Sequence, residues 1–258
     1  MTDLILPNDT RIELPLLTTL VENIQAISDD EYALERRKGL GASDSSVILG
    51  LNPYKTREDL IIEKRSTVIS DAERAIKTKD AVRKGFDLEP LILQKFSKLM
   101  ECDTPIKPPS MYQITATPCL TINFDGVHIL FTDEQTVDYL IPVEAKFVTT
   151  YGDKYYNREH AFKREIGDCI LHKNCRAYGD SIDRIKAKAE AVGIPPYYYT
   201  QIQQQIYGLE SPFGYLCALH DKGWETVLYF VPRDEECIRR ICIEGTKTWI
   251  KIGGKNNG

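Results

Sequence analysis

The sequence predicts one α/β domain with insertions, or at most two small domains. The chain has 258 residues, of which 42% are hydrophobic and 28% are charged, and this is enough to bury a substantial core. Four short runs with strand character follow one another between residues 112 and 148. Segments with helical spacing of apolar residues lie on both sides of this block. The sequence contains no internal repeat and no low-complexity segment.

Composition narrows the classes of function. No apolar run is long enough to span a bilayer and no secretory leader is present, so we expect a soluble, non-secreted, cytoplasmic protein. A net charge of -5 argues against a simple polyanion-binding module, although a local basic strip can still bind phosphate. Seven scattered cysteines argue against a disulfide framework. Cys169, His172 and Cys175 lie close in sequence, which leaves a metal site open beside free thiols.

The first hundred residues predict mainly helices. We expect a lead-in over residues 1–30 with helical spacing in Leu14–Ile27, a charged helix over Glu31–Lys38, a helix from the Thr56 cap to Arg65, a loop over 66–80 and a helix over Ala81–Met100. Gly85 and Pro90 predict a kink or two shorter helices in the last of these. Glu89 would then open a helical turn, where it complements the helix dipole or serves as a third carboxylate aimed at a metal.

The rest of the chain predicts strands, helices and a closing helix. We expect strands over Tyr112–Thr117, Cys119–Phe124, Gly126–Phe131 and Val137–Val148, helices over Arg158–Ile166, Ser181–Val192 and Tyr197–Tyr207, strands over Phe213–His220 and Trp224–Val231, a helix over Pro232–Ile252, and a disordered tail over 253–258. Pro142 suits the start or the edge of a strand, because proline cannot donate to a ladder.

Three charged residues stand out in the strand block. Glu144 and Lys146 are two apart, so on a strand they point to the same face. Asp125-Gly126 interrupts another β-prone run, and pairing of the two runs in one sheet would bring Asp125 to the same place. Two carboxylates and an ammonium suit a hard divalent cation and a lysine beside an attacking water. A Glu-x-Lys pair is also typical of a solvated face, and Asp-Gly of a hairpin turn.

A glycine-rich turn follows a basic segment. Gly39 and Gly41 free the backbone, and Ser43 or Asp44 is placed to cap a short helix that ends near Leu49. Such a turn, preceded by basic side chains, is a sound phosphate-binding site. Taken alone, it is more typical of an ordinary capped helix, since such turns are common.

Two later stretches carry polar and aromatic residues at helical spacing. Residues 151–193 interleave lysines and arginines with tyrosines, which suits the rim of a nucleic-acid site but also a solvated helix. Tyr198, Gln201 and Gln205 are one turn apart and form a stripe on one helix. Buried amides need hydrogen-bond partners, whereas surface glutamines would need none.

Five motifs in order resemble a known family. They are basic-Gly-x-Gly-Ala-Ser-Asp at 38–44, Gly-x-x-x-Glu-Pro at 85–90, Asp-Gly at 125–126, Glu-x-Lys at 144–146 and Tyr-x-x-Gln-x-Gln at 198–203. In this order the chain resembles the phage lambda exonuclease-like, or YqaJ-type viral recombinase, branch of the PD-(D/E)XK nucleases. The resemblance covers roughly Arg36–Val231. It implies a restriction-endonuclease-like core, with a central mixed β-sheet flanked by helices and a helical insertion over 151–193, in a single nuclease domain over 1–258.

The resemblance implies roles for particular residues. Asp125 and Glu144 look like the metal-binding carboxylates, with Glu89 as a third and the Ala145 carbonyl completing the ligand set. Lys146 would orient or help to deprotonate the attacking water.

Further roles concern the site's surroundings. Gln201 would orient the site, with Tyr198 one turn earlier. Arg36 and Ser43 match the residues that hold a terminal 5′ phosphate, with Arg37 as the alternative.

The implied activity is a Mg²⁺-dependent exonuclease, with one or two ions for which Mn²⁺ substitutes, that degrades linear duplex DNA from 5′ ends. It would leave 3′ tails for a single-strand annealing partner in a bacterial or phage-infected cell, and a homo-oligomer stays open. An endonuclease of the restriction or defence type and an inactive DNA-binding protein are the alternatives. The motif Asn-Phe-Asp-Gly in place of Pro-Asp-Gly and the long separation of Lys146 from Gln201 depart from the family pattern.

Overall fold

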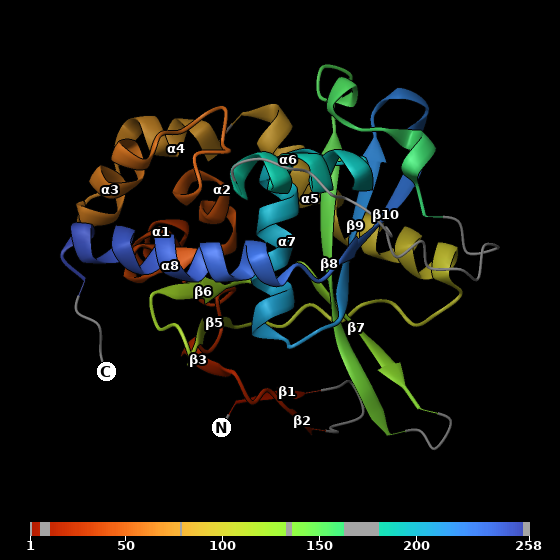
Figure 1. Ribbon diagram of the computed structural model, residues 1–258, viewed down its shortest axis with the longest axis horizontal. Coiled ribbons are helices and arrows are strands. Elements are labelled where there is room, and N and C mark those ends of the chain that lie inside the picture. The colour runs from red at the N-terminus through yellow and green to blue at the C-terminus, as the bar shows by residue number, and fades with distance from the viewer. Residues whose placement is uncertain (1, 6–10, 78, 133–135, 163–180, 255–258) are drawn as a thin grey trace.

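The computed structural model describes residues 2–5, 11–77, 79–132, 136–162 and 181–254 (Figure 1). The helices are α1 (Asp29–Glu35), α2 (Ser45–Ile48), α3 (Arg57–Arg65), α4 (Asp71–Lys77), α5 (Asp80–Met100), α6 (Ser181–Val192), α7 (Pro196–Gly208) and α8 (Glu235–Ile252). The strands are β1 (Asp3–Ile5), β2 (Arg11–Glu13), β3 (Leu17–Val21), β4 (Leu40–Gly41), β5 (Met111–Ile114), β6 (Leu120–Ile122), β7 (Gly126–Phe131), β8 (Val137–Val148), β9 (Phe213–His220) and β10 (Thr226–Pro232). Short 3₁₀ turns cover Arg36–Lys38, Ala42–Asp44, Asp153–Tyr155, Arg158–His160 and Lys222–Trp224.

A four-stranded mixed sheet with the order β10-β9-β8-β7 forms the centre. Strand β8 is antiparallel to β7 and parallel to β9, and β9 is antiparallel to β10. Helix α5 packs against the sheet, and α7 packs against β8 and β9 (Figure 1). This arrangement confirms the expected α+β class with a central mixed sheet flanked by helices.

The two faces of β8 carry different kinds of side chain and face different helices. Val143 and Ala145 pack with Ile92 and Phe96 of α5 in one apolar cluster. Because strand residues alternate between faces, Glu144 and Lys146 point to the other face, where α7 lies. The alternation predicted from the Glu-x-Lys spacing is therefore present.

The expected single strand block divides into two sheets. Strands β5 and β6 pair with each other and join β3 and β4 in a second sheet of order β3-β5-β6-β4. The pairing expected between the run ending at Phe124 and the Glu144 strand is therefore wrong. The chain crosses between the sheets after β6, with Phe124 buried, and it is β7, starting at Gly126, that pairs with β8. Asp125 still reaches the Glu144 strand, because it directly precedes β7.

Three expectations for the N-terminal part are corrected. The helical reading of Leu14–Ile27 is wrong, because Leu17–Val21 is strand β3, and its β-branched residues favour that state. Residues 66–80 are not only loop, since they contain α4. Helix α5 runs unbroken through Pro90.

The continuity of α5 has a physical reason. Ile92, Leu93 and Phe96 are buried against the sheet, and the burial of three such side chains outweighs the cost of about 3 kcal/mol for an internal proline. Glu89 therefore lies in the middle of α5, and its expected place in the first turn after a break is wrong.

Pro142 lies inside β8, paired with Val127, and the ladder to β9 begins only at the next residue, Val143. The expected edge position is therefore confirmed, because the missing N–H falls outside the ladder to β9. One further expectation fails in the second half. The helix expected over Arg158–Ile166 is a single 3₁₀ turn in its described part, and the Phe162 N–H donates to the Leu228 carbonyl of β10 at 2.7 Å.

Several local expectations are confirmed. Thr56 caps α3 together with Asp59 in a reciprocal pair of hydrogen bonds. Strands β7 and β9 and helix α6 have the expected bounds. The reading of residues 151–193 as an insertion stays a prediction, and residues 163–180 and 255–258 lie outside the described part of the chain. In the part that is described, no helix is both long and apolar enough to cross a membrane.

Candidate active site

The end of the β7–β8 ladder creates an opening in the central sheet. The last pair is Gly126 with Val143, and β8 then continues beside β9 alone. The N–H of Ala145 donates instead to a carboxylate oxygen of Asp125, Oδ2, at 3.0 Å. The Lys146 ammonium lies 3.8 Å from the same oxygen and forms an ion pair with Glu144. The structure thus brings Asp125, Glu144 and Lys146 together, as the sequence predicted.

Glu144 is the most buried member of this group. Only 1% of its surface is exposed, and two amides of α7 hold its carboxylate: Gln201 donates to Oε1, and Gln205 donates to Oε2 at 2.6 Å. Burial and the charge of Asp125 raise the pKa of Glu144 to about 7, against the opposing effect of Lys146. Gln201 and Gln205, the two glutamines of the stripe seen in the sequence, therefore fix this carboxylate by hydrogen bonds.

Lys146 keeps its positive charge in this setting. Burial disfavours the charged form, but the carboxylates of Glu144 and Asp125 outweigh burial and raise the pKa of Lys146. Its ammonium also lies 5.4 Å from the ring centroid of Tyr198, within the range of a cation–π contact. Tyr198 thus belongs to the site through Lys146.

Glu89 approaches from α5. Its carboxylate is mostly buried and forms an ion pair with Lys107, a residue that the sequence did not single out. Burial and the charge of Asp125 raise the pKa of Glu89, so the two carboxylates lie within electrostatic reach of each other. We call Glu89, Asp125, Glu144 and Lys146 the acidic cluster. Among the described residues, no three His, Cys, Asp or Glu side chains are arranged around one metal position.

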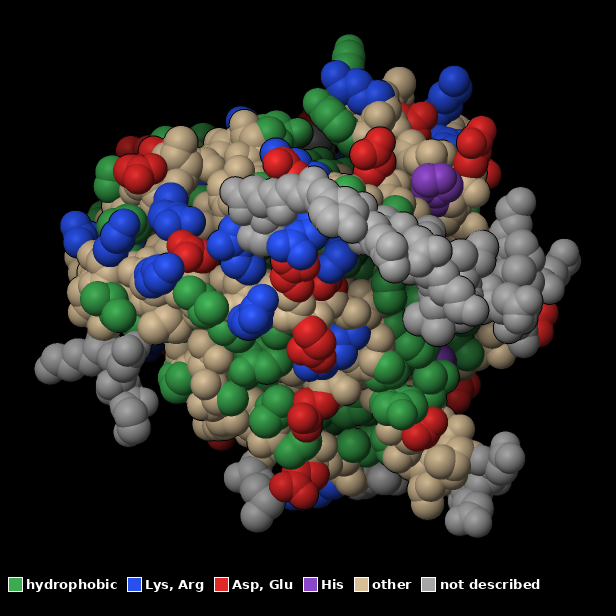
Figure 2. Space-filling model, viewed as in Figure 1, with side chains coloured by type: hydrophobic (Ala, Val, Ile, Leu, Met, Phe, Trp, Pro, Cys, Tyr) green, Lys and Arg blue, Asp and Glu red, His purple; other side chains and the backbone are tan. Residues whose placement is uncertain are grey.

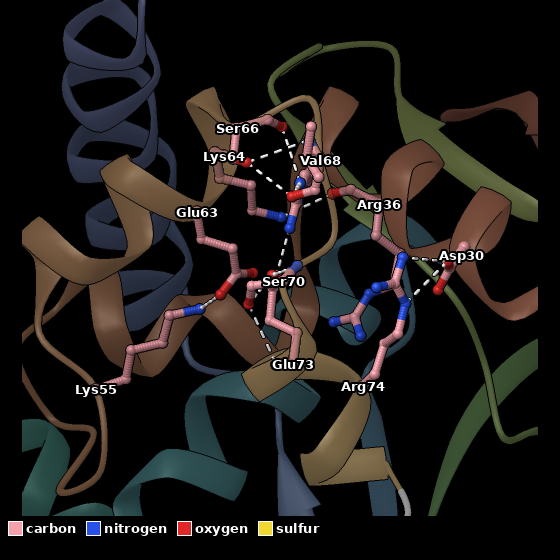
Figure 3. Close-up of polar contacts among 11 residues, drawn as sticks. Asp30, Arg36, Lys55, Glu63, Lys64, Ser66, Val68, Ser70, Glu73 and Arg74 are labelled. Atoms are coloured by element: carbon pink, nitrogen blue, oxygen red, sulfur yellow. Dashed lines mark hydrogen bonds and ion pairs between the residues drawn. The ribbon is translucent and has the colours of Figure 1, made fainter.

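A second polar group, the basic turn, is formed by Arg36, Ser43, Asp44 and Lys64. Arg36 donates to the Ser43 hydroxyl at 2.9 Å, and the Lys64 ammonium lies 2.8 Å from Asp44. The Lys64 ammonium also donates to the Arg36 carbonyl at 2.7 Å (Figure 3). Asp44 accepts from the Gly41 N–H at 2.9 Å. The expected capping of the following helix by Ser43 or Asp44 is therefore wrong, because both side chains are engaged within the turn.

The charges in the basic turn stabilise its one carboxylate. Burial alone would raise the pKa of Asp44, but the charges of Lys64, Arg36 and Lys55 outweigh it and lower that pKa. Lys64 and Lys55 come from α3 and the loop before it, and Lys55 pairs with Glu63 (Figure 3). Sequence reasoning missed Lys64, because it meets Asp44 only through the packing of α3.

Arg37 points away from the basic turn. Its guanidinium is buried and donates to the carbonyls of Ser66 and Val68, at 2.9 and 3.0 Å, and to Glu73 at the start of α4 (Figure 3). Its donors are used to hold the segment between α3 and α4. The geometry therefore favours Arg36 over Arg37 as a phosphate ligand.

Helix α7 connects the two groups through adjacent residues. Gln205 donates to Glu144, whereas Gln204 donates to the carbonyls of Leu40 and Thr121 at 3.0 and 2.9 Å and accepts from Ser45. Gln204 is fully buried, and all three partners lie beside the basic turn or in β6. The sequence signal was the run of amides, which flagged buried glutamines without showing which residue each would meet.

The remaining candidates are only partly described. Tyr155 and Tyr156 lie in the described part of the 151–193 stretch, whereas Cys169, His172 and Cys175 lie outside it. The described cysteines, Cys102, Cys119, Cys217, Cys237 and Cys242, form no disulfide bond with one another. On the face shown in Figure 2, basic and acidic side chains are interspersed, consistent with local rather than overall positive charge.

Known proteins match both the sequence and the fold. The model of the YqaJ-like viral recombinase domain matches residues 31–208. The uncharacterized protein YqaJ of Bacillus subtilis (strain 168) is 39% identical over 71 residues, which are 27% of this chain and 21% of that protein, so the match spans about a fifth of the relative.

The fold is similar to that of an alkaline exonuclease, LHK-Exo, from Laribacter hongkongensis. The TM-score is 0.54 at 15% identity, over 86% of this chain and 92% of the other. The complex of LHK-Exo with dAMP gives 0.53 at 14% identity over the same shares. This likeness concerns the fold. The family match spans more than half of the chain and includes the acidic cluster, the basic turn and α7, and the chain therefore belongs to the YqaJ-like viral recombinase family.

Proposed function

We propose that this protein is a Mg²⁺-dependent deoxyribonuclease that degrades linear duplex DNA from 5′ ends. The observation that carries the proposal is the convergence of Asp125, Glu144 and Lys146 where β8 extends past the end of β7. Family membership and the fold shared with an alkaline exonuclease support it. The 3′ tails left by such digestion would serve a single-strand annealing protein in phage-type recombination, in the cytoplasm of a bacterial or phage-infected cell.

The acidic cluster has the chemistry of a site for a hard divalent cation. Carboxylate oxygens are the ligands that Mg²⁺ prefers. Asp125, directly before β7, and Glu144, in β8, would supply them, with Glu89 and the Ala145 carbonyl as further candidates. The raised pKa values of Glu89 and Glu144 show that burial and mutual repulsion disfavour the ionised carboxylates. A bound cation would offset that repulsion. One or two Mg²⁺ ions, or Mn²⁺ in their place, would activate water and stabilise the leaving 3′ oxygen.

The chain's own groups divide the remaining tasks. Gln201 and Gln205 fix the two oxygens of Glu144 and so orient it. The Lys146 ammonium would orient the attacking water and stabilise the negative charge that develops on the phosphate. Its raised pKa makes a charge-stabilising role the stronger one, because a neutral amine is needed to accept a proton.

The basic turn supplies a binding site for the end of the DNA. Arg36 and Ser43 already contact each other, and the cations Arg36, Lys64 and Lys55 outnumber the carboxylates of Asp44 and Glu63. Such a group suits a terminal 5′ phosphate, which carries more negative charge than an internal phosphodiester. This is the feature that favours an exonuclease over an endonuclease.

The test compares wild type and Lys146→Ala on 5′-phosphorylated linear duplex and on a covalently closed circle, with Mg²⁺ or with a chelator. Wild type should digest the linear DNA only with Mg²⁺ and leave the circle intact. Lys146→Ala should lose about 10²- to 10³-fold in rate. Lys222→Ala, an exposed lysine in the turn after β9, is the control. Urea unfolding of each variant verifies that it is folded.

The outcomes separate the alternatives. End-labelled duplexes report polarity, since a 5′ label should leave the duplex before a 3′ label does. Cutting of the circle would assign an endonuclease instead. DNA binding without digestion by wild type at high enzyme concentration would assign a catalytically inactive protein, and the proposal would be wrong.

A further inference from the structure

A groove of about 530 Å³ adjoins the acidic cluster. Its walls are the loop after α2, residues 154–157, and the segment that joins α6 to α7. Tyr156 lines the groove, and its ring centroid lies 6.4 Å from that of Tyr198, whose ring is the cation–π partner of Lys146. One layer of aromatic rings therefore separates the groove from the candidate catalytic lysine.

The wall formed by residues 154–157 is fixed to the body of the protein. The Asn157 N–H donates to the Gly193 carbonyl at 2.9 Å. Gly193 has φ +88, and a Cβ at this position would lie 2.7 Å from the Asn157 carbonyl oxygen, so only glycine fits. The groove is thus a preformed feature of the fold.

Aromatic rings with exposed surface stand at the edge of the groove. Tyr54 is 76% exposed and Tyr155 is 49% exposed. The ring of Tyr54 makes an edge contact with that of Tyr197, which lines the groove, at 6.1 Å between centroids. Two exposed aromatic rings beside one groove offer faces on which a planar ligand can stack.

The charged lining residues favour an anion, but only moderately. Among the described residues they are Lys154, Lys186 and Glu190. The Lys154 ammonium lies 5.0 Å from the ring centroid of Tyr155, which combines a stacking surface with a positive charge. Lys186 meets Asp183 at 3.4 Å, in an exposed contact of a kind that contributes little energy.

We propose that this groove binds a segment of single-stranded DNA beside the site of cleavage, with unpaired bases stacked on Tyr54 and Tyr155 and phosphates near Lys154 and Lys186. Exposed aromatic rings beside lysines are the combination that binds single strands without sequence preference. Paired bases keep their faces inside the duplex, so they cannot stack on these rings. The inference rests on the proposed nuclease function for its biological setting, but the binding can be measured without cleavage.

The experiment measures fluorescence anisotropy of a labelled oligothymidylate of about 12 nucleotides with the full chain in chelator. Tyr54→Ala and Tyr155→Ala should each weaken binding by about 5- to 150-fold, the factor for one lost base–aromatic stack. Tyr54→Phe and Tyr155→Phe retain the ring and should bind like wild type. Tyr139→Ala is the matched control, because Tyr139 is 43% exposed and lies near the opposite end of β8 from residues 154–157.

Defined results would overturn the inference. They are no binding by wild type, alanine variants that bind like wild type, phenylalanine variants as weak as the alanine variants, or a loss in Tyr139→Ala as large as in Tyr155→Ala. Equal competition by a duplex of the same length, or by dTMP at the same nucleotide concentration, would also overturn it. A parallel digestion of linear duplex with Mg²⁺ reports on the proposed function separately, since wild type can fail either assay while passing the other.

Discussion

The acidic cluster and the basic turn carry opposite imbalances of charge. In the acidic cluster, burial and the charge of Asp125 raise the pKa values of two other carboxylates, Glu89 and Glu144. In the basic turn, the pKa of the one carboxylate, Asp44, is lowered by several cations. An added cation therefore stabilises the acidic cluster, and an added anion is accommodated by the basic turn.

The difference fits the two tasks that the proposed function gives these groups, which are to bind a divalent cation and to bind a terminal phosphate. A metal-binding centre is built by collecting more carboxylates than the local lysines neutralise. A phosphate-binding centre is built by leaving cations in excess of one carboxylate. Four predictions, ordered from the largest expected effect to the smallest, test this contrast.

Asp125→Asn should lower nuclease activity by about 10³-fold, because it removes one metal-binding charge from the acidic cluster. The asparagine oxygen can still accept from the Ala145 N–H, so the fold should persist. Mg²⁺ should stabilise wild type by about 2.7 kcal/mol at a hundred times its Kd, but not the variant, as measured by thermal unfolding. Asp221→Asn, at an exposed position after β9, is the control. Equal stabilisation of both variants by Mg²⁺ would place the metal elsewhere.

Activity at subsaturating Mg²⁺ should fall about tenfold for each pH unit below about 7, where Glu144 takes up a proton and stops being a ligand. The free energy of unfolding should change with pH in the opposite direction to the activity. The reason is that Glu144 binds its proton more tightly in the folded chain than in the unfolded chain, where its pKa is near 4.5. Metal-free protein should therefore lose stability as the pH rises from 4.5 to about 7.

Asp44 of the basic turn should not titrate in that window. The lowered pKa of Asp44 means that its contribution to stability is present above its ordinary value of 3.8 and is lost only as the pH falls through the lowered value. The measurements are a pH profile of initial rates and urea unfolding at each pH. A rate that is flat from about pH 8 to about pH 6 would contradict the assignment to Glu144.

Arg36→Ala should reduce the preference for 5′-phosphorylated over 5′-hydroxyl ends by about tenfold or more, the effect of one lost charge-assisted hydrogen bond. Arg37→Ala is the comparison, because its guanidinium holds Ser66, Val68 and Glu73 instead. It should lower the free energy of unfolding by about 1–3 kcal/mol while leaving the preference unchanged. The measurement is the ratio of the digestion rates on 5′-phosphorylated and 5′-hydroxyl DNA. The reverse pattern would assign phosphate binding to Arg37 and the structural role to Arg36.

Gln204→Leu should lower the free energy of unfolding by about 2–3 kcal/mol, because the carbonyls of Leu40 and Thr121 and the Ser45 hydroxyl lose their partner. Gln205→Leu removes one donor from Glu144 and should cost about 1 kcal/mol, with a further rise in the pKa of Glu144. Urea unfolding gives both values. A larger loss for Gln205→Leu would show that α7 is anchored mainly through the acidic cluster.

Sequence patterns predicted the parts of this molecule that depend on neighbouring residues. The period-2 spacing placed Glu144 and Lys146 on one face, the Thr56 cap began a helix, and turn residues bounded β7 and β9. The roles given to the site residues remain predictions, although the structure brings Asp125, Glu144, Lys146 and Gln201 together.

What the sequence could not show depends on packing between distant segments. The pairing of Asp44 with Lys64 requires α3 to lie against the turn. The Lys107–Glu89 ion pair requires the segment between α5 and β5, which contains Lys107, to return past α5. Pro90 was read as a break because local propensity ignores the sheet that holds α5 straight. The division into two sheets was also invisible, since β-prone runs do not state their partners.

The adjacent side chains of Gln204 and Gln205 fix the distance between the basic turn and the acidic cluster. Helix α7 is held through Gln204 to the segment that would bind the 5′ end of a DNA strand. It is held through Gln205 to Glu144, the carboxylate that would lie beside the bond to be cut. The distance between the two groups is then set by a rigid helix instead of a flexible loop. In the nuclease proposed above, that distance would set the size of the fragment released in each cycle, whatever its base sequence.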